Sequence, residues 1–435
     1  MKTTRSILPQ PVCATGFTVL DFIAHRRDSI LRIAKFLRHL TCILKQIVFD
    51  DPKSPYHNHQ YVYSDTTLAT QDHAVTGLNA FVPGRDEVYQ ALNLISSWPD
   101  YSQSPLLSCP GLADELGIGK VWIKDESKRF GLGGVKALGA PYGLKRQLLK
   151  RGIEPGSPQC RDYTAIAATD GNHGLATAWA ATKFNCPAKI YVGSDVDPAR
   201  MRRIRDNGAE LVYVDGTYDD AVLAASDAAI ASNVLLITDT DYSGDLDVTR
   251  DIMAGYAVLG VECARQLRAQ NETLDSIFLQ CGVGGMAAGC AIGMWHETGQ
   301  KPVVCSVEPE TAACVKTSIE RGTLTRVPGK LLTRMVGLSC GCPSLSAFEI
   351  LQDVCIGNIV INDTIAKRVQ DQMTLGVRND PPLDTWDTGI SGIAGLWHVA
   401  QNPELRDRFA LTSQSRVLVI NSEGAIPDQY LQPNV

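Results

Sequence analysis

Short apolar runs alternate with stretches of helical periodicity along most of the chain from residue 120 onward. Such runs predict buried strands, and apolar residues recurring at helical spacing predict amphipathic helices. The predicted strands are KVWIKD, YTAIAATD, AKIYVG, AELVYVD, VLLITD, SIFLQC, PVVCSVEP, NIVIND and RVLVINS. The predicted helices cover residues 135–150, 172–184, 218–232, 249–270 and 344–355, begin near 198, 285 and 311, and follow NIVIND. This alternation requires right-handed crossovers and a parallel sheet covered on both faces, so the pattern predicts an α/β fold.

The first 50 residues differ in character from the rest of the chain. Between Arg26 and Val48, apolar residues recur at helical spacing with Arg, Lys and His on the other face, and acidic residues are scarce before Asp50. Residues 1–50 are therefore expected to form an N-terminal extension, either an import peptide or an extra amphipathic helix. The expected location is cytoplasmic, or mitochondrial if the extension directs import. No apolar run reaches the roughly 18 residues that a membrane-spanning helix needs, so no membrane partner is expected.

The composition is that of a globular protein large enough for two lobes. The 435 residues are 44% hydrophobic and 20% charged. The net charge of -6 comes without a long basic block, so no nucleic-acid partner is expected. Thirteen cysteines are scattered singly, apart from Cys340 and Cys342, and none lies in a paired C-x-x-C pattern. We therefore expect reduced thiols in a reducing compartment, with no metal site and no disulfide framework.

Four predicted strands are followed by loops of small, polar or glycine residues. These loops are TDGNHG (169–174), TDTDYSG (238–244), CGVGGMAAG (281–289) and NSEGA (421–425). In open parallel sheets, ligands bind at the carboxyl ends of the strands, where the chain turns into the helices. The four loops are therefore candidates for one binding site. The clearest long loop elsewhere is VRNDPPLDTWDTG, at 377–389.

The loop CGVGGMAAG leaves a predicted buried strand and enters a predicted helix. Glycines let the backbone approach an anion, and the free N–H groups of a helix N-terminus favour phosphate, so a phosphate-bearing ligand is indicated. A tight packing turn is the alternative. Gly282, Gly284 and Ala287 also fit the dinucleotide pattern G-x-G-x-x-A, with Glu308 as the acid for the ribose. An NAD(P)-dependent oxidoreductase is thus a competing interpretation, although Pro309 follows the acid directly.

Lys136 is the one cation in a run of Gly, Ala, Val and Leu between residues 131 and 140. Burial disfavours an ammonium, so this setting predicts a lowered lysine pKa and a nucleophilic amine. Neutral lysine amines condense with aldehydes, and such lysines are typical Schiff-base residues. An aldehyde that also carries a phosphate is pyridoxal phosphate. Lys136 and the loop at 282–285 together predict this cofactor.

The segment DYSQSPLLSCPGLADELGIGKVWIKDESKRFGLGGVKALGA resembles the opening of fold-type II pyridoxal-phosphate enzymes, the tryptophan synthase β-like superfamily. It is most similar to diaminopropionate ammonia-lyases, whose pattern has GY..TPL, KDE..RFGL..FK.LGG and then TDGNHG. The likeness extends from about residue 60 to 425. The ordered combination of lysine motif, DGNHG, Gly-rich loop and NSEG is specific for the fold type and less so for the substrate. The resemblance implies a two-lobed fold of mostly parallel, helix-covered sheets.

The resemblance also implies roles for single positions. Lys136 matches the lysine that anchors the cofactor, Asn172 the residue that bonds its phenolic oxygen, and Ser422 the hydroxyl residue that faces its pyridine nitrogen. The residues that match the phosphate cradle are Gly282, Val283, Gly284 and Gly285. A serine can donate a hydrogen bond to the ring nitrogen without a charge, which limits the electron-sink strength of the ring and favours β-elimination over transamination.

Asp170 and Asp239 match two carboxylates that the ammonia-lyases place beside the substrate. The implied reaction is α,β-elimination on a small amino acid, with diaminopropionate giving pyruvate and ammonia. Lys136 would remove the Cα proton, and one of the carboxylates would hold the β-ammonium or carry protons. As alternatives, Asp170 is only a helix N-cap and Asp239 an ordinary polar loop residue.

A dehydratase or β-replacement enzyme is the alternative within the same fold. Its substrate would be serine, threonine, hydroxyaspartate or another β-substituted amino acid.

The expected larger lobe comprises 51–141 and 256–435, and the smaller lobe comprises 142–255. Relatives of this type are usually homodimers, so a homodimer is expected.

Two segments depart from the family pattern. In DTGISGIAGL (387–396), Ile390 occupies the place of an acid in the SGESGA-like segment of relatives. Gly134 and Val135 stand where an aromatic residue often precedes the lysine. The segment DESKRF (125–130), which precedes Gly134, is expected to be a solvated turn. In it, Lys128 or Arg129 is a candidate to hold a substrate carboxylate.

Overall fold

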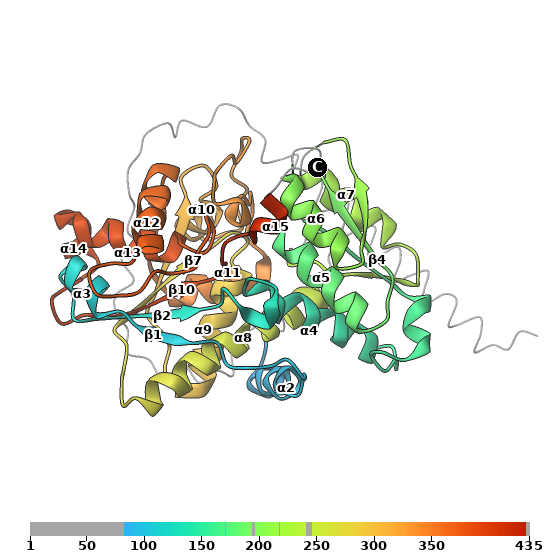
Figure 1. The fold of residues 1–435 in the computed structure, drawn as a ribbon, viewed down its shortest axis with the longest axis horizontal. Coiled ribbons are helices and arrows are strands. Elements are labelled where there is room, and N and C mark those ends of the chain that lie inside the picture. The colour runs from blue at the N-terminus through green and yellow to red at the C-terminus, as the bar shows by residue number, and fades with distance from the viewer. Residues whose placement is uncertain (1–81, 170, 194–195, 217, 241–245, 432–435) are drawn as a thin grey trace, which may run out of the picture. The chain divides into compact units, whose positions relative to one another are not determined.

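A computed structural model describes residues 82–169, 171–193, 196–216, 218–240 and 246–431 (Figure 1). The helix expected between Arg26 and Val48 and the side chain of Asp170 lie outside the described residues. Among the helices that are described, none is both long enough and apolar enough to cross a bilayer.

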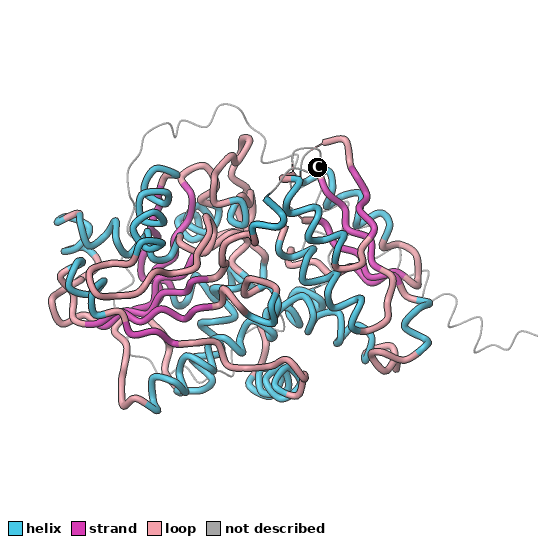
Figure 2. Tube along the Cα trace, in the orientation of Figure 1, coloured by secondary structure: helices cyan, strands magenta, loops and turns pink. Residues whose placement is uncertain are grey.

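The described strands form two sheets (Figure 2). The six-stranded sheet has the order β1-β2-β10-β7-β8-β9, and the four-stranded sheet has the order β5-β4-β3-β6. Every pair of neighbours is parallel except β1 and β2. The strands are β1 (Leu106–Ser108), β2 (Lys120–Asp125), β3 (Thr164–Ala168), β4 (Ala188–Val192), β5 (Glu210–Tyr213), β6 (Val234–Leu236), β7 (Ser276–Gln280), β8 (Val304–Pro309), β9 (Cys355–Ile361) and β10 (Arg416–Asn421). The predicted α/β class is confirmed.

Helices follow most of the strands and cover the sheets. Helices α5 and α7 pack against β3 and β4, and α13 packs against β7, β8, β9 and β10 (Figure 1). The described helices are α2 (Arg85–Ser96), α3 (Pro110–Leu116), α4 (Lys136–Leu149), α5 (Asn172–Lys183), α6 (Pro198–Asp206), α7 (Tyr218–Ala228), α8 (Leu246–Ala269), α9 (Gly285–Thr298), α10 (Cys314–Arg321), α11 (Leu345–Val354), α12 (Asp363–Leu375), α13 (Ser391–Gln401), α14 (Pro403–Arg408) and α15 (Asp428–Leu431).

Each strand and helix predicted from residue 120 onward is present, and most have shifted ends. Helix α10 begins at Cys314 rather than near 311, because the Glu308 carboxylate accepts hydrogen bonds from the amides of Val315 and Lys316. The elements that the pattern missed are α2, β1, α3, α13, α14 and α15. Helix α13 is buried on nearly all sides, so its sequence SGIAGLWHVAQ has no polar face to reveal a helical period.

The strands of the four-stranded sheet lie between Thr164 and Leu236, within the range 142–255 expected for the smaller lobe. Strands of the six-stranded sheet come from both sides of that range. The exact lobe boundaries stay a prediction.

Side chains of the six-stranded sheet alternate between two apolar clusters. On β7, Ile277 and Leu279 belong to a cluster with α4, α8 and α9, whereas Phe278 belongs to a second cluster with α12 and α13. On β10, Leu418 and Ile420 likewise face the first cluster. This period of two places one apolar layer on each face of the sheet. The first cluster continues into the four-stranded sheet, so both sheets share part of one core.

Helices α4, α8 and α9 pack so closely that glycine is required where they touch. A Cβ atom on Gly260 of α8 would lie 2.0 Å from the carbonyl oxygen of Cys290 on α9. A Cβ on Gly293 of α9 would lie 2.0 Å from Ala257 O, and one on Gly255 would lie 2.5 Å from Leu138 O of α4. Because these neighbours are backbone atoms, a side chain would have to push the helices apart.

We expect Gly260→Ala to lower the free energy of unfolding by about 1–3 kcal/mol, the usual cost of overpacking a core. The control is Gly84→Ala, because a Cβ at Gly84 meets a single atom, Glu87 Oε2 at 3.5 Å, and nothing closer. Urea unfolding of the two variants and the parent protein measures the difference. Equal losses in both variants would contradict the close helix contact.

The segment DESKRF is not a solvated turn. Arg129 is 3% exposed and binds Glu126 (Nε–Oε2 2.7 Å) and Glu262 of α8 (Nη2–Oε2 2.8 Å). The Glu262 carboxylate also accepts from Lys124 Nζ at 2.6 Å, and all four side chains are buried. We call these four residues the buried charge cluster. Because the Arg129 guanidinium is fully paired with these carboxylates, the hypothesis that it holds a substrate carboxylate is wrong.

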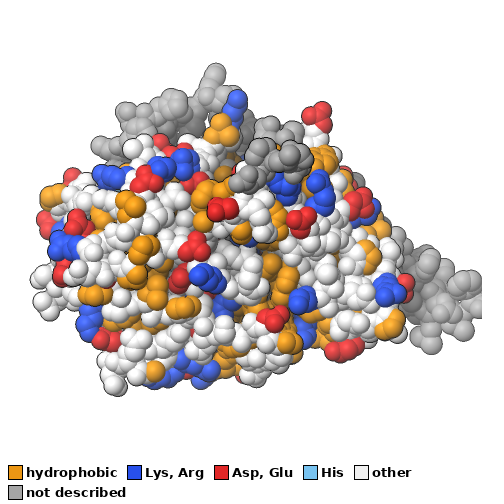
Figure 3. Space-filling model, in the orientation of Figure 1, with side chains coloured by type: hydrophobic (Ala, Val, Ile, Leu, Met, Phe, Trp, Pro, Cys, Tyr) orange, Lys and Arg blue, Asp and Glu red, His pale blue; other side chains and the backbone are white. Residues whose placement is uncertain are grey.

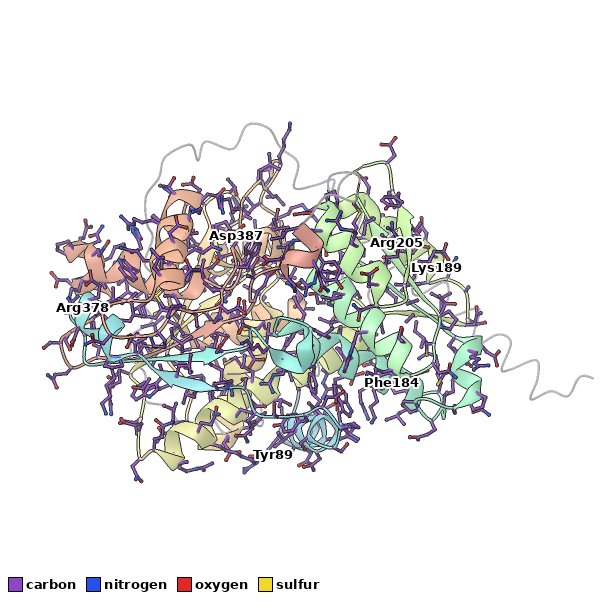
Figure 4. The ribbon with its side chains drawn as sticks, viewed as in Figure 1. Tyr89, Phe184, Lys189, Arg205, Arg378 and Asp387 are labelled. Atoms are coloured by element: carbon purple, nitrogen blue, oxygen red, sulfur yellow. The ribbon has the colours of Figure 1, made fainter. Side chains whose placement is uncertain are left out.

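Charged side chains of both signs are interspersed with apolar ones on the face shown in Figure 3. Several link neighbouring elements. Tyr89 of α2, labelled in Figure 4, donates from its hydroxyl to Glu297 of α9 at 2.8 Å. Asp387, in the loop before α13, accepts from Arg334 at 2.9 Å (Figure 4).

Candidate active site

The loops that follow β3, β6, β7 and β10 meet at one cavity. Its lining includes the sequence-predicted residues Lys136, Asn172, Asp239, Gly282, Val283, Gly284, Gly285 and Ser422. Both sheets contribute, since β3 and β6 belong to the smaller sheet and β7 and β10 to the larger one. The structure therefore brings together the candidate residues that it describes.

Lys136 is the first residue of α4 and extends into the cavity. Its Nζ lies 2.9 Å from Asp239 Oδ2 and 5.5 Å from the centre of the Tyr256 ring. The preceding residue, Val135, donates its backbone N–H to the carbonyl of Ser422 at 2.9 Å. This bond fixes the lysine relative to the serine that follows β10.

The expected lowering of the Lys136 pKa is wrong. Burial does favour the neutral amine, but the Asp239 carboxylate beside Nζ outweighs burial and raises the pKa of Lys136 above its ordinary value. Asp239 lies 103 residues further along the chain, so the local sequence around the lysine could not reveal it. In this structure Lys136 is an ammonium held by a carboxylate.

Asp239 joins the lysine to a histidine. Burial opposes ionisation of Asp239, yet the Lys136 ammonium beside it holds the pKa of its carboxyl below the usual range. His173 Nε2 contacts the carbonyl oxygen of Ile237 at 2.8 Å and so carries the ring proton as donor. Burial lowers the pKa of His173, which leaves its Nδ1 unprotonated, 3.7 Å from Asp239 Oδ2. A neutral imidazole thus stands behind the carboxylate.

The loop before α9 presents amide groups to the cavity. The carbonyl of Val283 accepts from Ser344 N at 2.9 Å, and the carbonyl of Gly282 accepts from Cys314 Sγ at 3.4 Å. Because C=O and N–H point in opposite directions in a trans peptide, the next N–H groups along the loop point away from these partners. The first amides of α9 also lack acceptors within the helix.

Two glycines of this loop are required for different reasons. Gly284 has φ of +89°, and a Cβ there would lie 2.9 Å from Leu351 Cδ1. At Gly285, the first residue of α9, a Cβ would meet one atom within 4 Å, Tyr256 Cε2 at 4.0 Å. The space in front of Gly285 is therefore open, and a side chain would fill it.

Ser422 has a neighbour that the sequence did not single out. Gln280, the last residue of β7, is 1% exposed and donates from Nε2 to Ser422 Oγ at 2.8 Å. It also lines the cavity. In the run SIFLQC, Gln280 looks like one more strand residue. The available signal of a functional role was a polar glutamine at the end of a strand that is otherwise buried and apolar.

Arg200 and Glu423 were also missed. Arg200 Nη2 lies 3.2 Å from Glu423 Oε1, and both buried side chains line the cavity. Glu423 is part of NSEGA, so that motif contained the signal. Ile390, the departure from the family pattern, is fully buried in the core at the start of α13, while Thr388 from the same loop lines the cavity.

Glu308 does not serve a ribose. It is fully buried and accepts from the amides of Val315 and Lys316, both at 2.7 Å. Burial raises the pKa of this carboxyl to about 8. The acid that the dinucleotide interpretation required is therefore the cap of α10.

Comparison with known proteins identifies the family. The family model described as "Pyridoxal-phosphate dependent enzyme" matches residues 98–381. This chain belongs to that family. The nicotinamide interpretation is thereby wrong, and the predicted cofactor, pyridoxal phosphate, is confirmed for the family.

Among its relatives, diaminopropionate ammonia-lyase of Salmonella typhimurium is 33% identical over 365 residues, which cover 79% of this chain and 90% of the relative. The Escherichia coli diaminopropionate ammonia-lyase in complex with D-serine has a TM-score of 0.73 and 29% identity, covering 81% of this chain and 92% of that one. Its structure with an aminoacrylate-PLP azomethine reaction intermediate has a TM-score of 0.72 and 30% identity, covering 81% and 94%. The fold-type II resemblance is confirmed.

The residues of the cavity fit pyridoxal phosphate. The amides of the Gly-rich loop, with open space before Gly285, suit a phosphate. A lysine lies in the same cavity for the aldehyde, and a buried serine hydroxyl for the ring nitrogen. Among the described residues, no group of three His, Cys, Asp or Glu side chains is arranged to hold a metal ion. The nine buried cysteines of the described part are free thiols.

We expect Gly284→Ala to weaken cofactor binding by at least about tenfold, because a side chain strains the left-handed backbone and displaces the loop amides. The measurement is the dissociation constant of pyridoxal phosphate from the apoenzyme, followed by absorbance. The matched control is Gly322→Ala, since Gly322 also has a left-handed φ of +65° but caps α10 with no atom within 4 Å of a Cβ. Equal affinity in both variants would contradict the cradle.

Proposed function

We propose that this chain catalyses pyridoxal-phosphate-dependent α,β-elimination on a small amino acid, with diaminopropionate as the substrate. The products are pyruvate and two molecules of ammonia, with one water consumed. The observation that carries the proposal is the cavity in which the Lys136–Asp239 pair and the amides of the Gly-rich loop meet. Similarity to diaminopropionate ammonia-lyases over most of the chain supports the choice of substrate.

When bound, the cofactor withdraws electrons from the substrate and so acidifies its Cα–H bond. Gly282, Val283, Gly284 and Gly285 would hold its phosphate through backbone amides. Asn172 would bond its phenolic oxygen and Ser422 its ring nitrogen. Lys136 would anchor its aldehyde carbon between turnovers.

Lys136 is the group placed to take the Cα proton at Nζ. Asp239 Oδ2, 2.9 Å away, stabilises the ammonium that results. The departing β-amine needs one proton, which the same ammonium can return, so the enzyme gains and loses no proton overall. Burial lowers the pKa of His173, so its Nδ1 behind Asp239 is a weak base and does not compete for this proton.

Asp170 is proposed to bind the β-amino group of the substrate, and its position before α5 in TDGNHG supports this role. A homodimer in the cytoplasm is the proposed form of the protein. Import into mitochondria through residues 1–50 is the alternative location.

The test is a substrate panel with purified protein loaded with pyridoxal phosphate. Diaminopropionate is expected to give ammonia and pyruvate in a ratio of two to one. Faster release of keto acid and ammonia in equal amounts from serine, threonine or hydroxyaspartate would instead assign a dehydratase. Consumption of an added thiol into a new amino acid would assign β-replacement.

Lys136→Ala is expected to abolish turnover, with a fall of at least about 10³-fold, and to leave no cofactor attached after borohydride reduction. Mass spectrometry of the digested protein locates the reduced label. Lys128→Ala is the control, since Lys128 is an exposed lysine of the same segment and does not line the cavity. A label on any residue other than Lys136 would overturn the assignment.

Asp239→Asn is expected to lower the pH at which Lys136 captures the cofactor. Asp239 raises the lysine pKa and burial lowers it, so removal of the carboxylate leaves the lowering alone and the amine becomes neutral at lower pH. The measurement is the amount of borohydride-trapped label after brief exposure of apoenzyme to pyridoxal phosphate across a pH series. Asp275→Asn, which alters an exposed aspartate paired with Arg416, is the control. An unchanged or higher midpoint in Asp239→Asn would contradict the role of the pair.

A further inference from the structure

We infer that Gln280 is a positioning residue that makes the Ser422 hydroxyl an obligatory hydrogen-bond donor toward the ring nitrogen of the cofactor. Gln280 ends β7 and Ser422 follows β10, which is the neighbouring parallel strand. Both side chains are buried and line the cavity. The inference rests on the proposed placement of Ser422 at the ring nitrogen.

The orientation of the Gln280 amide is decided by its surroundings. Besides Ser422 Oγ, its Nε2 faces the backbone carbonyl oxygens of Ile420 at 3.0 Å, Gly389 at 3.3 Å and Thr388 at 3.5 Å. Backbone carbonyls accept hydrogen bonds and never donate them. A flipped amide would press its oxygen against these acceptors, so the nitrogen must be the atom that faces them.

The other end of the amide agrees with this orientation. Gln280 Oε1 is buried and finds no hydrogen-bond partner among the described residues. Leaving this buried amide oxygen unpaired costs free energy. In the flipped orientation, however, the NH₂ group would take the unpaired position and lose its carbonyl acceptors, which would cost more. Three carbonyls therefore lock the side chain with its NH₂ group toward Ser422.

The direction of the serine proton follows from this lock. An amide nitrogen has no lone pair to accept a hydrogen bond, so Ser422 Oγ is the acceptor in its 2.8 Å contact with Gln280. Gln280 is the one partner of Ser422 Oγ found in the described part of the chain. The single hydroxyl proton finds no acceptor in the described part of the chain and remains free for a group in the cavity. If Oγ used its second lone pair to accept from a protonated ring, this proton would be left buried without a partner, so donation is the favoured arrangement.

A serine fixed as donor can bind a pyridine nitrogen only when that nitrogen is unprotonated. An unprotonated ring withdraws electrons less strongly than a pyridinium ring, which is sufficient to expel a β-substituent but disfavours the longer-lived carbanion that transamination requires. Gln280 thereby selects elimination over transamination, although it touches no reacting atom.

The test uses holoenzyme reconstituted with pyridoxal phosphate labelled with ¹⁵N in the ring. In the unaltered protein, the ring-nitrogen NMR signal is expected to stay at the position of an unprotonated, hydrogen-bonded pyridine throughout the pH range in which the protein is folded. A pyridinium signal at neutral pH would overturn the inference without any variant.

Gln280→Met keeps the size of the side chain and removes its donor. The serine proton can then turn toward the side that the Gln280 amide had occupied while Oγ accepts from a protonated ring, so the ¹⁵N signal is expected to move toward the pyridinium position and to titrate. The rate at which alanine converts bound pyridoxal phosphate to pyridoxamine phosphate, with pyruvate as the other product, should rise about tenfold relative to the elimination rate, the effect of one hydrogen bond. Restoration of the original signal in Gln280→Asn, which retains a shorter amide, would support the donor role further.

Ser422→Ala and the double variant separate the possible failures. If Gln280 acts through Ser422, Gln280→Met should cause no further ¹⁵N change in the Ser422→Ala background. An equal change in both backgrounds, or no change from Gln280→Met alone, would overturn the inference. An unchanged signal in Ser422→Ala would instead show that the proposed placement of Ser422 is wrong, independently of substrate turnover.

Discussion

The ion pair between Lys136 and Asp239 is the contact on which the arrangement of the cavity depends. It connects the first turn of α4 to the loop after β6, and these come from distant parts of the sequence. The bond from Val135 N to the Ser422 carbonyl fixes the same lysine to the end of β10. Together, the two contacts set the amine, the carboxylate and the hydroxyl at defined places around one space. The pair also determines the protonation state of the lysine, since the carboxylate outweighs the effect of burial.

The period of the apolar residues was sufficient to predict the parallel sheets and to place four loops at strand ends. Local composition then indicated that Lys136 and the glycines at 282–285 bind a cofactor. Properties that depend on distant partners could not be predicted in this way. The pKa of Lys136 depends on Asp239, and the burial of Arg129 depends on Glu262 of α8. Gln280 was missed because its importance lies in carbonyls of two other segments that its neighbours in the sequence do not reveal.

Glycines serve two opposite purposes in this fold. Between α4, α8 and α9 they remove side chains so that helix backbones can touch, and the three helices pack densely. At Gly285 the missing side chain leaves space open instead. A glycine that leaves space open, such as Gly285, can be recognised in the sequence because it lies in the Gly-rich motif of the family. Glycines of the first kind are spread along ordinary helices, so their role is apparent only when the facing helix is known.

The buried charge cluster of Lys124, Glu126, Arg129 and Glu262 carries two cations and two carboxylates, so its formal charge is balanced. Dissolved ions weaken attractions between charges that they can approach, and they cannot approach side chains that are out of contact with water. Exposed pairs such as Arg416 with Asp275 lie within reach of those ions. The cluster joins the segment leading to Lys136 to α8. The lysine is therefore carried by a framework whose electrostatic energy falls much less in concentrated salt than that of exposed pairs.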